Sequence, residues 1–321
     1  MGAALDLSSI AVGAADGKAA LARALAAIEG RGDDADVASL LDSAWKAPRG
    51  HVLGLTGPPG VGKSSLTNAL ISAWRKAGRT VAIIAVDPSS RLSGGALLGD
   101  RIRLSTDPED RGVFVRSMAA RDRLGGLAAL TVPAMVLMRA LYDLVVIETV
   151  GVGQSETDVV EAADSIVFCV QPGSGDSLQF MKAGIMEIPD ITVVTKADMG
   201  SVATRARADV RGAVSLADDR GDGWTPPVIL LSSATGQGID QLIEAIDAHA
   251  AHLAEGGLAT RRAAQGLAWT RDSIRSRFGS EGLRLAEKAL PQDLSPFAAT
   301  RWAREHLRIG LSPHILMSLP G

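Results

Sequence analysis

Residues 51–66 read HVLGLTGPPGVGKSSL, a strand-like apolar run that leads straight into a glycine-rich loop. The segment from Gly57 to Ser64 matches the phosphate-loop pattern G-x-x-x-x-G-K-[ST] in full. Apolar residues then recur at helical spacing, at positions 66, 70, 71 and 74. Strand, loop and helix in this order are the context that the motif requires, so the sequence predicts a nucleotide-phosphate site here.

Six further apolar runs share the β-branched, nearly unbroken character of the first, which is typical of strands buried on both faces of a parallel sheet. They are residues 80–88, 113–117, 142–149, 165–172, 191–198 and 227–233. Helical patterns at 64–76 and 238–253 lie between or after them. This alternation predicts an α/β fold, the doubly wound and mostly parallel sheet of P-loop NTPases.

Both ends of the chain are helical in pattern. Residues 1–48 are rich in Ala and Leu and are predicted to form an N-terminal helical extension of the P-loop domain, residues 49–254. In residues 255–321 a pattern of Ala, Leu and Arg is interrupted by Gly279, Pro291, Pro296 and Pro313, which predicts a C-terminal helical arm. The arm is too short and too segmented to build a core alone, so we expect it to pack on the α/β domain or on another chain.

Composition excludes several classes of protein. The 321 residues are 46% hydrophobic and 21% charged, which suffices for a sizeable core and argues against global disorder. A net charge of −3 provides no overall positive potential that would attract nucleic acid. Aromatic residues make up only 3% of the chain, which argues against a surface on which bases stack. The one cysteine, Cys169, allows no disulfide framework, and no apolar run is long enough to span a membrane. We therefore expect a cytoplasmic protein without a nucleic-acid or membrane partner.

The phosphate loop supplies most of the predicted nucleotide contacts. Its glycines let backbone N–H groups curl around phosphates, and the following helix N-terminus adds a favourable dipole. Lys63 is expected to reach the β and γ phosphates as a catalytic residue, and Ser64 to hold Mg²⁺. The predicted contacts are Gly57, Pro58, Gly60, Val61, Gly62, Lys63, Ser64 and Ser65.

Residues 195–198 read TKAD directly after an apolar run, which fits the base-selecting pattern [NT]-K-x-D. The Asp198 carboxylate would accept hydrogen bonds from guanine N1–H and the 2-amino group, a donor pair that adenine lacks. The Lys196 stem would cover one face of the base. Thr195 stands where Asn is commoner and predicts weaker bracing of the phosphate loop. A second loop, residues 232–236, would offer backbone N–H groups of Ser233 and Ala234 to the guanine carbonyl.

Carboxylates at the ends of two predicted strands indicate a metal site. Asp87 ends one strand and Glu148 another, where Mg²⁺ and its waters would be held beside Ser64. The competing interpretation is that both merely cap the following segments. Gly151 and Gly153, with Gln154, would give the next loop the freedom that a γ-phosphate sensor needs. Asp100 is a candidate to orient the attacking water, with a solvated helix charge as the alternative.

Seven stretches in fixed order resemble the MeaB/ArgK/MMAA family of GTPases over roughly residues 50–250. They are GPPGVGKSS, AVDPSS with GGALLGDRIR, VRSMA with LGGLA, ETVGVGQSE, QPGSGDSLQFMKAG, TKAD and SSATGQGI. The resemblance implies a GTPase that uses GTP, GDP and Mg²⁺ and chaperones a coenzyme-B12-dependent acyl-CoA mutase, chiefly methylmalonyl-CoA mutase. Such a chaperone gates cofactor loading and protects or reactivates the mutase.

The same resemblance assigns roles to particular segments. Lys63 and Ser64 would bind phosphate and Mg²⁺, Asp87 and Glu148 would complete the metal sphere, and Asp100 would lie in the first switch. Residues 173–179, which include Asp176, together with Lys182 would form a third switch that couples the nucleotide to the mutase. An ordinary glycine-rich turn before a helix is the alternative for this stretch. The arm, residues 255–321, would form the surface of a homodimer.

The sequence departs from the family's pattern at two positions, and three alternative functions stay open. The departures are Thr195, in place of the usual Asn, and Arg91. Arg91 and the charged cluster at 121–123 leave the client mutase open among methylmalonyl-, isobutyryl-, 2-hydroxyisobutyryl- and ethylmalonyl-CoA mutases. A metallochaperone-type GTPase would need Cys or His ligands near the switches, but Cys169 is predicted to be a core residue. His249 and His252 are interpreted as surface or interface residues.

A small-molecule kinase, the second alternative, would prefer ATP, which Asp198 opposes. A scaffold that binds nucleotide without hydrolysing it is the third. None of the motifs contains a strong candidate for an arginine finger. The sequence therefore predicts slow basal GTP hydrolysis that a partner accelerates by ordering the switches.

Overall fold

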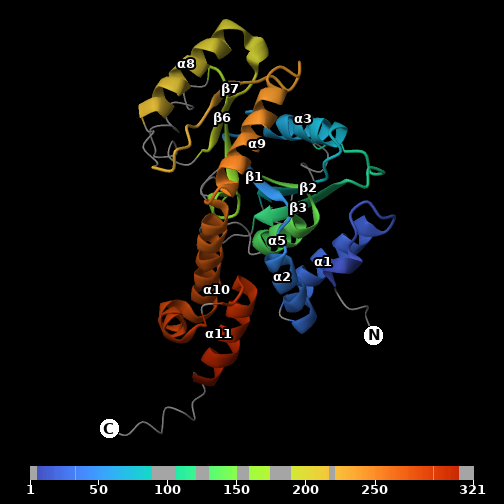
Figure 1. Ribbon diagram of the computed structural model, residues 1–321, viewed down its shortest axis with the longest axis vertical. Helices are drawn as coiled ribbons and strands as arrows, with labels where there is room; N and C mark the ends of the chain where they lie inside the picture. The colour runs from blue at the N-terminus through green and yellow to red at the C-terminus, as the bar shows by residue number, and fades with distance from the viewer. Residues whose placement is uncertain are drawn as a thin grey trace.

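The computed structural model describes residues 6–32, 34–88, 104, 106–120, 130–149, 159–173, 189–216, 221–291 and 293–310 (Figure 1). The predicted functional residues Asp100, Gly151, Gly153, Gln154, Asp176 and Lys182 lie outside these ranges. Arg91 and the cluster at 121–123 lie outside them as well. Asp87 lies within a described strand, but only its backbone is described.

Seven described strands form one parallel sheet in the order β3-β2-β4-β1-β5-β6-β7. Each of the seven predicted runs coincides with one strand, although β3 continues three residues beyond the run at 113–117, and the predicted α/β fold is confirmed. The strands are β1 (His51–Thr56), β2 (Val81–Pro88), β3 (Val113–Ala120), β4 (Leu144–Glu148), β5 (Ser165–Val170), β6 (Ile191–Val194) and β7 (Val228–Leu230). The central strands β1, β4 and β5 are buried along almost their whole length, as helices on both faces require.

Helices cover both faces of the sheet. On one face, α3 (Lys63–Lys76) and α9 (Ile239–Ala254) pack on the odd-numbered residues of β5, such as Val167 and Cys169. On the other, α1 (Gly17–Arg31), α2 (Ala35–Lys46), α5 (Thr131–Leu141) and α8 (Ser201–Leu216) pack against even-numbered residues such as Ile166 and Phe168. This alternation follows from the period of two along a strand. Short 3-10 turns are η1 (Leu7–Ser9), η2 (Val159–Glu161) and η4 (Ala197–Met199).

The buried thiol of Cys169 confirms that this residue belongs to the core. Its side chain is fully enclosed in β5, and burial raises the pKa of the Cys169 thiol to about 12. The thiol is therefore protonated and shielded at neutral pH, and it is an inert packing residue rather than a metal ligand.

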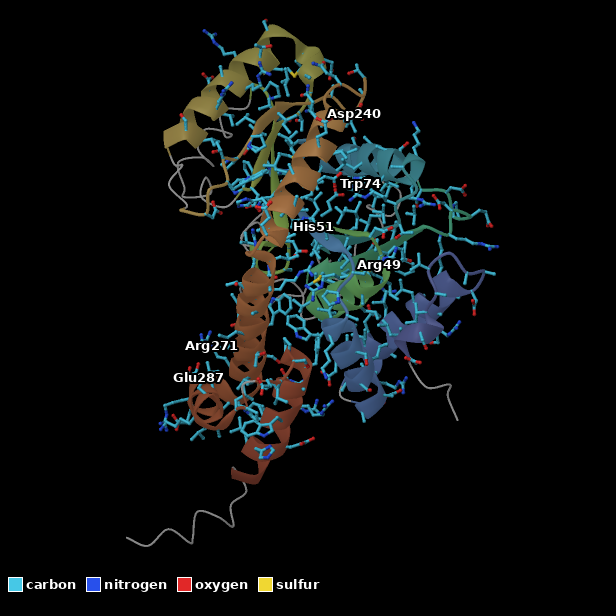
Figure 2. The ribbon with its side chains drawn as sticks, viewed as in Figure 1. Arg49, His51, Trp74, Asp240, Arg271 and Glu287 are labelled. Carbon is cyan, nitrogen blue, oxygen red and sulfur yellow. The ribbon has the colours of Figure 1, made fainter. Side chains whose placement is uncertain are left out.

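The C-terminal arm leaves the sheet as α10 (Leu258–Ala289) and continues as α11 (Pro296–Gly310), and Figure 1 shows both extending away from the strands. Gly279, with φ +70°, bends α10 between two helical halves. An ion pair of 3.0 Å between Arg271 and Glu287 joins the halves, and both residues lie on the outer side of the arm (Figure 2). Among the described residues, the arm has its own small core of Ile274, Leu283, Ala286 and Ala303.

The arm also packs on the body of the protein, as the sequence predicts. Trp45 of α2 meets Trp269 of α10 edge-on, with ring centroids 5.8 Å apart. A Cβ at Gly266 would lie 2.8 Å from the Trp45 ring, so only glycine allows this approach. No described helix is long and apolar enough to cross a bilayer.

A network of buried polar groups fastens α10 to the amino-terminal edge of the sheet. Arg262 forms a bidentate ion pair with the fully buried Asp164, at 2.8 and 2.6 Å. Gln265 donates to the backbone carbonyls of Val160 and Ala163 at 3.3 and 2.9 Å. The arm is thus tied to η2 and to the short segment between η2 and β5.

The prediction that His249 and His252 are surface or interface residues is wrong for His249. His249 is 1% exposed, and its Nδ1 lies 2.6 Å from the Ser165 hydroxyl, which also lies 2.7 Å from Nε2 of His51. Burial is the main cause that lowers the pKa of His249 to about 4, so the ring is neutral at physiological pH. The spacing of three residues between His249 and His252 does not show which face of α9 packs on the sheet, so the burial of His249 does not follow from the sequence. Figure 2 shows His51 where α9 crosses the sheet.

Candidate nucleotide site

The loop between β1 and α3 has a backbone that only its glycines allow. Gly57 has φ +137°, and a Cβ there would lie 2.3 Å from the carbonyl oxygen of Cys169. Gly62, with φ +103°, stands immediately before the first residue of α3. Residues Pro58, Gly60, Val61 and Ser65 complete the turn and the first helical positions, as the motif predicts. The helix N-terminus directs its backbone N–H groups and positive dipole end toward this loop, an arrangement suited to phosphate.

Lys63 folds back over the loop. Its Nζ donates to the carbonyl oxygens of Gly57 at 2.6 Å and Pro58 at 3.0 Å, and the side chain is buried. The ammonium group is thus enclosed by the backbone that would surround a bound phosphate. A cation in this position is ready to attract the β and γ phosphates.

Glu148 and Ser64 meet at the carboxyl-terminal edge of the sheet. Ser64 Oγ donates to Glu148 Oε1 at 2.5 Å, and Glu148 is 7% exposed at the end of β4. In the strand register Glu148 lies opposite Ala85 of β2, which places the Asp87 backbone at the same edge two residues further along. A hydroxyl and carboxylates are hard oxygen donors, so these residues fit Mg²⁺. No cluster of three or more His, Cys, Asp or Glu side chains suited to a metal occurs in the described part of the chain.

The structure also identifies a residue that the motif does not include. Thr67 Oγ1 lies 2.8 Å from Glu148 Oε2 and 3.1 Å from the carbonyl oxygen of Lys63, and its side chain is fully buried. In the sequence, Thr67 is one polar residue in an amphipathic helix. One feature of the sequence could indicate this contact: Thr67 stands three residues after Ser64 and therefore lies on the same face of α3.

Thr195 connects the base loop with the phosphate loop. Its buried hydroxyl lies 2.9 Å from the carbonyl oxygen of Val61 and 3.1 Å from that of Val170. A hydroxyl has one hydrogen, so it must share this hydrogen between the two acceptors. The phosphate loop is therefore braced from β6 despite the replacement of the commoner Asn.

Asp198 and Lys196 lie where the two base loops meet. Ser232 Oγ donates to Asp198 Oδ1 at 2.6 Å, and this bond holds the pKa of Asp198 below its ordinary value. Lys196, in a left-handed conformation with φ +54°, donates from Nζ to Gln171 Oε1 at 2.8 Å. The Ala197 amide donates to the Leu231 carbonyl at 3.0 Å, which ties the TKAD segment to the strand end before Ser233 and Ala234. The carboxylate is thus ionised and oriented, as recognition of a paired N–H donor requires.

Replacing Asp198 with asparagine is expected to lower the affinity for GTP on the order of a hundredfold and to favour xanthosine nucleotides. The amide would direct an N–H group at the 2-amino group of guanine, whereas the xanthine carbonyl at that position would accept it. Competition of GTP, XTP and ATP against a fluorescent GDP measures the change. Asp209→Asn, at an exposed position on α8, is the matched control. Unchanged selectivity for GTP over ATP would refute the role of Asp198.

A parallel sheet with a phosphate loop after β1 and a guanine-type loop after β6 defines the class of P-loop GTPases. A family model described as "Methylmalonyl Co-A mutase-associated GTPase MeaB" matches residues 21–283. The chain belongs to this family, and it is a GTP-hydrolysing enzyme that binds GTP and GDP. The match includes both base loops, all seven described strands and much of α10.

Similar proteins agree with this assignment. A "Putative GTPase" of Caulobacter vibrioides is 40% identical over 281 residues, which cover 85% of this chain and 86% of the relative. The "Methylmalonic aciduria type A homolog, mitochondrial" of Mus musculus is 38% identical over 221 residues, covering 68% of this chain and 53% of the mouse protein. A crystal structure titled "LAO/AO transport system kinase" matches with a TM-score of 0.62 and 28% identity, over 91% of this chain and 93% of that one.

Proposed function

We propose that the protein is a GTP-hydrolysing chaperone of a coenzyme-B12-dependent acyl-CoA mutase, either methylmalonyl-CoA mutase or a sister mutase. In this role it gates cofactor loading and protects or reactivates the mutase. The family match over residues 21–283 is the observation that carries the proposal. The relative named for methylmalonic aciduria supports the same class of partner. The proposal includes a cytoplasmic location, since the sole cysteine of the sequence leaves no pair for a disulfide.

In the proposed mechanism, the chain's own residues position the phosphates for transfer to water. The loop amides of residues 57–62 and the Lys63 ammonium stabilise negative charge on the β and γ phosphates. Ser64, Asp87 and Glu148 hold Mg²⁺, which neutralises charge on the phosphate oxygens when bound. Asp100 orients the attacking water.

The nucleotide state is proposed to act on the mutase through the switch segments. Gly151 and Gln154 respond to the γ-phosphate, and the segment with Asp176 and Lys182 transmits this state to the mutase. Basal hydrolysis is slow because none of the motifs supplies an arginine finger, and the mutase accelerates it by ordering these segments.

The test is GTP hydrolysis by the purified protein, alone and with a panel of acyl-CoA mutases. We expect one mutase to raise the turnover of GTP severalfold, with ATP as a control that shows no such rise. Cofactor loading of that mutase should then depend on GTP. Tight GTP binding with no stimulation by any mutase would contradict the chaperone role and leave the GTPase assignment in place.

Phosphoryl transfer to a small molecule is the second candidate function, since a matched crystal structure is titled as a kinase. Asp198 opposes it, because its ionised carboxylate suits guanine better than adenine. A kinase would transfer the γ-phosphate of ATP to the acceptor and release little inorganic phosphate. Release of one phosphate per GTP consumed, in the absence of any acceptor, would exclude this candidate.

We also propose three regions: a helical extension at 1–48, the GTPase domain at 49–254 and a dimerising arm at 255–321. Exposed leucines on the arm support a homodimer, since Leu267 and Leu285 are 50% and 43% exposed. Light scattering should give the mass of a dimer, and Leu267→Glu should reduce it to that of a monomer. A monomer in the unsubstituted protein would overturn the dimer.

A further inference from the structure

The carboxylate of Glu148 is held from two sides by hydroxyl groups of one helix. Ser64 Oγ lies 2.5 Å from Oε1, and Thr67 Oγ1 lies 2.8 Å from Oε2. Ser64 and Thr67 are three residues apart, so both project from the same face of α3 toward the end of β4. Each oxygen of this carboxylate therefore has its own hydroxyl partner.

The two hydroxyls differ in what they can do when a cation is present. Ser64 belongs to the phosphate-loop motif, and its oxygen is itself a proposed ligand of Mg²⁺. Thr67 lies outside the motif, one turn deeper in the helix, where its side chain is fully buried. It is thus placed to orient Glu148 without contacting the metal or the nucleotide.

Orientation matters more for Glu148 than for a shorter carboxylate. A glutamate side chain has three torsions, so its carboxylate can adopt many orientations. Mg²⁺ requires near-octahedral geometry with metal–oxygen distances of about 2.0–2.1 Å, which few of those orientations satisfy. Partners that fix the position of metal ligands typically change metal affinity by about 10–100-fold when they are removed. A buried threonine is suited to this task, because its branched Cβ restricts the rotamer that presents the hydroxyl.

We propose that Thr67 is a positioning residue that fixes Glu148 for Mg²⁺ and thereby sets the metal affinity of the nucleotide-bound protein. This inference rests on the proposed Mg²⁺ site and is independent of the mutase role. Thr67 also contacts the Lys63 carbonyl at 3.1 Å, a bond within the helix that a test must separate from the bond to Glu148.

The experiment measures how Mg²⁺ slows the release of fluorescent mant-GDP, with the Mg²⁺ concentration at half effect as the readout. Thr67→Val keeps the shape of the side chain and removes the hydroxyl. We expect the Mg²⁺ midpoint to rise about tenfold, while mant-GDP release in excess EDTA stays unchanged. Thr67→Ser restores the hydroxyl and should return the midpoint to near the original value.

Thr270→Val is the matched control. Thr270 is also a buried helical threonine, and its hydroxyl bonds the carbonyl oxygen of Gly266 at 2.8 Å, four residues earlier on α10. Its substitution removes the same kind of helix bond far from the site, so the Mg²⁺ midpoint should not move. If Thr67→Val does not fold, Thr67→Ala is measured in its place with the same expectation.

Three outcomes would overturn the proposal. An unchanged Mg²⁺ midpoint in Thr67→Val would show that Glu148 needs no such partner. An equal change of mant-GDP release in EDTA would show that Thr67 shapes the phosphate loop instead of the metal site. Release that is independent of Mg²⁺ in the unsubstituted protein would remove the proposed Mg²⁺ site itself, and with it the role of Thr67.

Discussion

Substituting Lys63 with alanine is expected to lower GTP turnover by at least about a hundredfold, the scale set by loss of one donor that stabilises transition-state charge. The Nζ atom is enclosed by the carbonyl oxygens of Gly57 and Pro58, where it would meet the transferring phosphate. Alanine would remove the only side-chain cation that the motif places in the loop. Phosphate release and mant-GTP binding, measured together, separate lost affinity from lost turnover.

Lys76→Ala provides the control for Lys63→Ala. Lys76 ends the same helix α3, but its side chain is exposed and far along the helix from the loop. Its substitution should leave turnover within a factor of about two, because an exposed charge is screened by solvent. Full turnover in Lys63→Ala would refute the assignment of the phosphate loop.

Substituting Arg262 with methionine is expected to cost about 3–5 kcal/mol of unfolding free energy, because it leaves the fully buried Asp164 carboxylate without its cation. Arg262 forms two hydrogen bonds with this carboxylate and a third, of 2.9 Å, with the carbonyl oxygen of Gly50. Chemical denaturation at pH 7 measures the loss. The junction between α10 and the sheet should unfold more readily, since Arg262 joins these two parts.

Arg271→Met is the matched control on the same helix. Arg271 pairs with Glu287 at 3.0 Å, but both side chains are about half exposed, at 49% and 46%. Surface pairs of this kind contribute about 0–1 kcal/mol, so the unfolding free energy should change by no more than that. Similar losses in Arg262→Met and Arg271→Met would contradict the special role of the buried pair.

The cost of Arg262→Met is also expected to depend on pH. Burial acts to raise the pKa of Asp164, but the hydrogen bonds and charge of Arg262, helped by His51, hold the pKa below its ordinary value. The pair therefore stabilises the protein above the ordinary carboxyl pKa, and this contribution is lost as pH falls through the lower folded value. In Arg262→Met burial raises the pKa, so the variant and the original protein should differ less at pH 4 than at pH 7. Denaturation curves at both values test this.

The sheet could be predicted from the sequence because its strands are marked locally. Runs such as residues 142–149 and 165–172 are apolar, β-branched and bounded by turn residues, so periodicity and composition suffice to find them. The phosphate loop and the TKAD segment were recognised for the same reason. Each is a short continuous stretch whose chemistry depends on neighbours in sequence.

The remaining features depend on contacts between distant residues, which no local pattern records. Asp164 and Arg262 are 98 positions apart, and Ser165 and His249 are 84 apart. The burial of His249 depends on which face of α9 packs on β5, and the sequence of the helix does not show this. The sequence around Thr67 does not by itself show that the Glu148 carboxylate, at the end of β4, lies beside its hydroxyl. Contacts between residues that are distant in sequence, and not local secondary-structure propensity, determine where these side chains lie.

The inert thiol in β5 has a practical consequence for following the molecule in solution. Since Cys169 is the sole cysteine of the sequence and its pKa is raised to about 12, thiol-directed dyes will leave the native protein unlabelled at neutral pH. A cysteine introduced at an exposed position such as Asp272, whose side chain is 70% exposed on α10, would then carry the only attached dye. Spectroscopy of the arm can thus be performed without first removing a native side chain from the centre of the sheet.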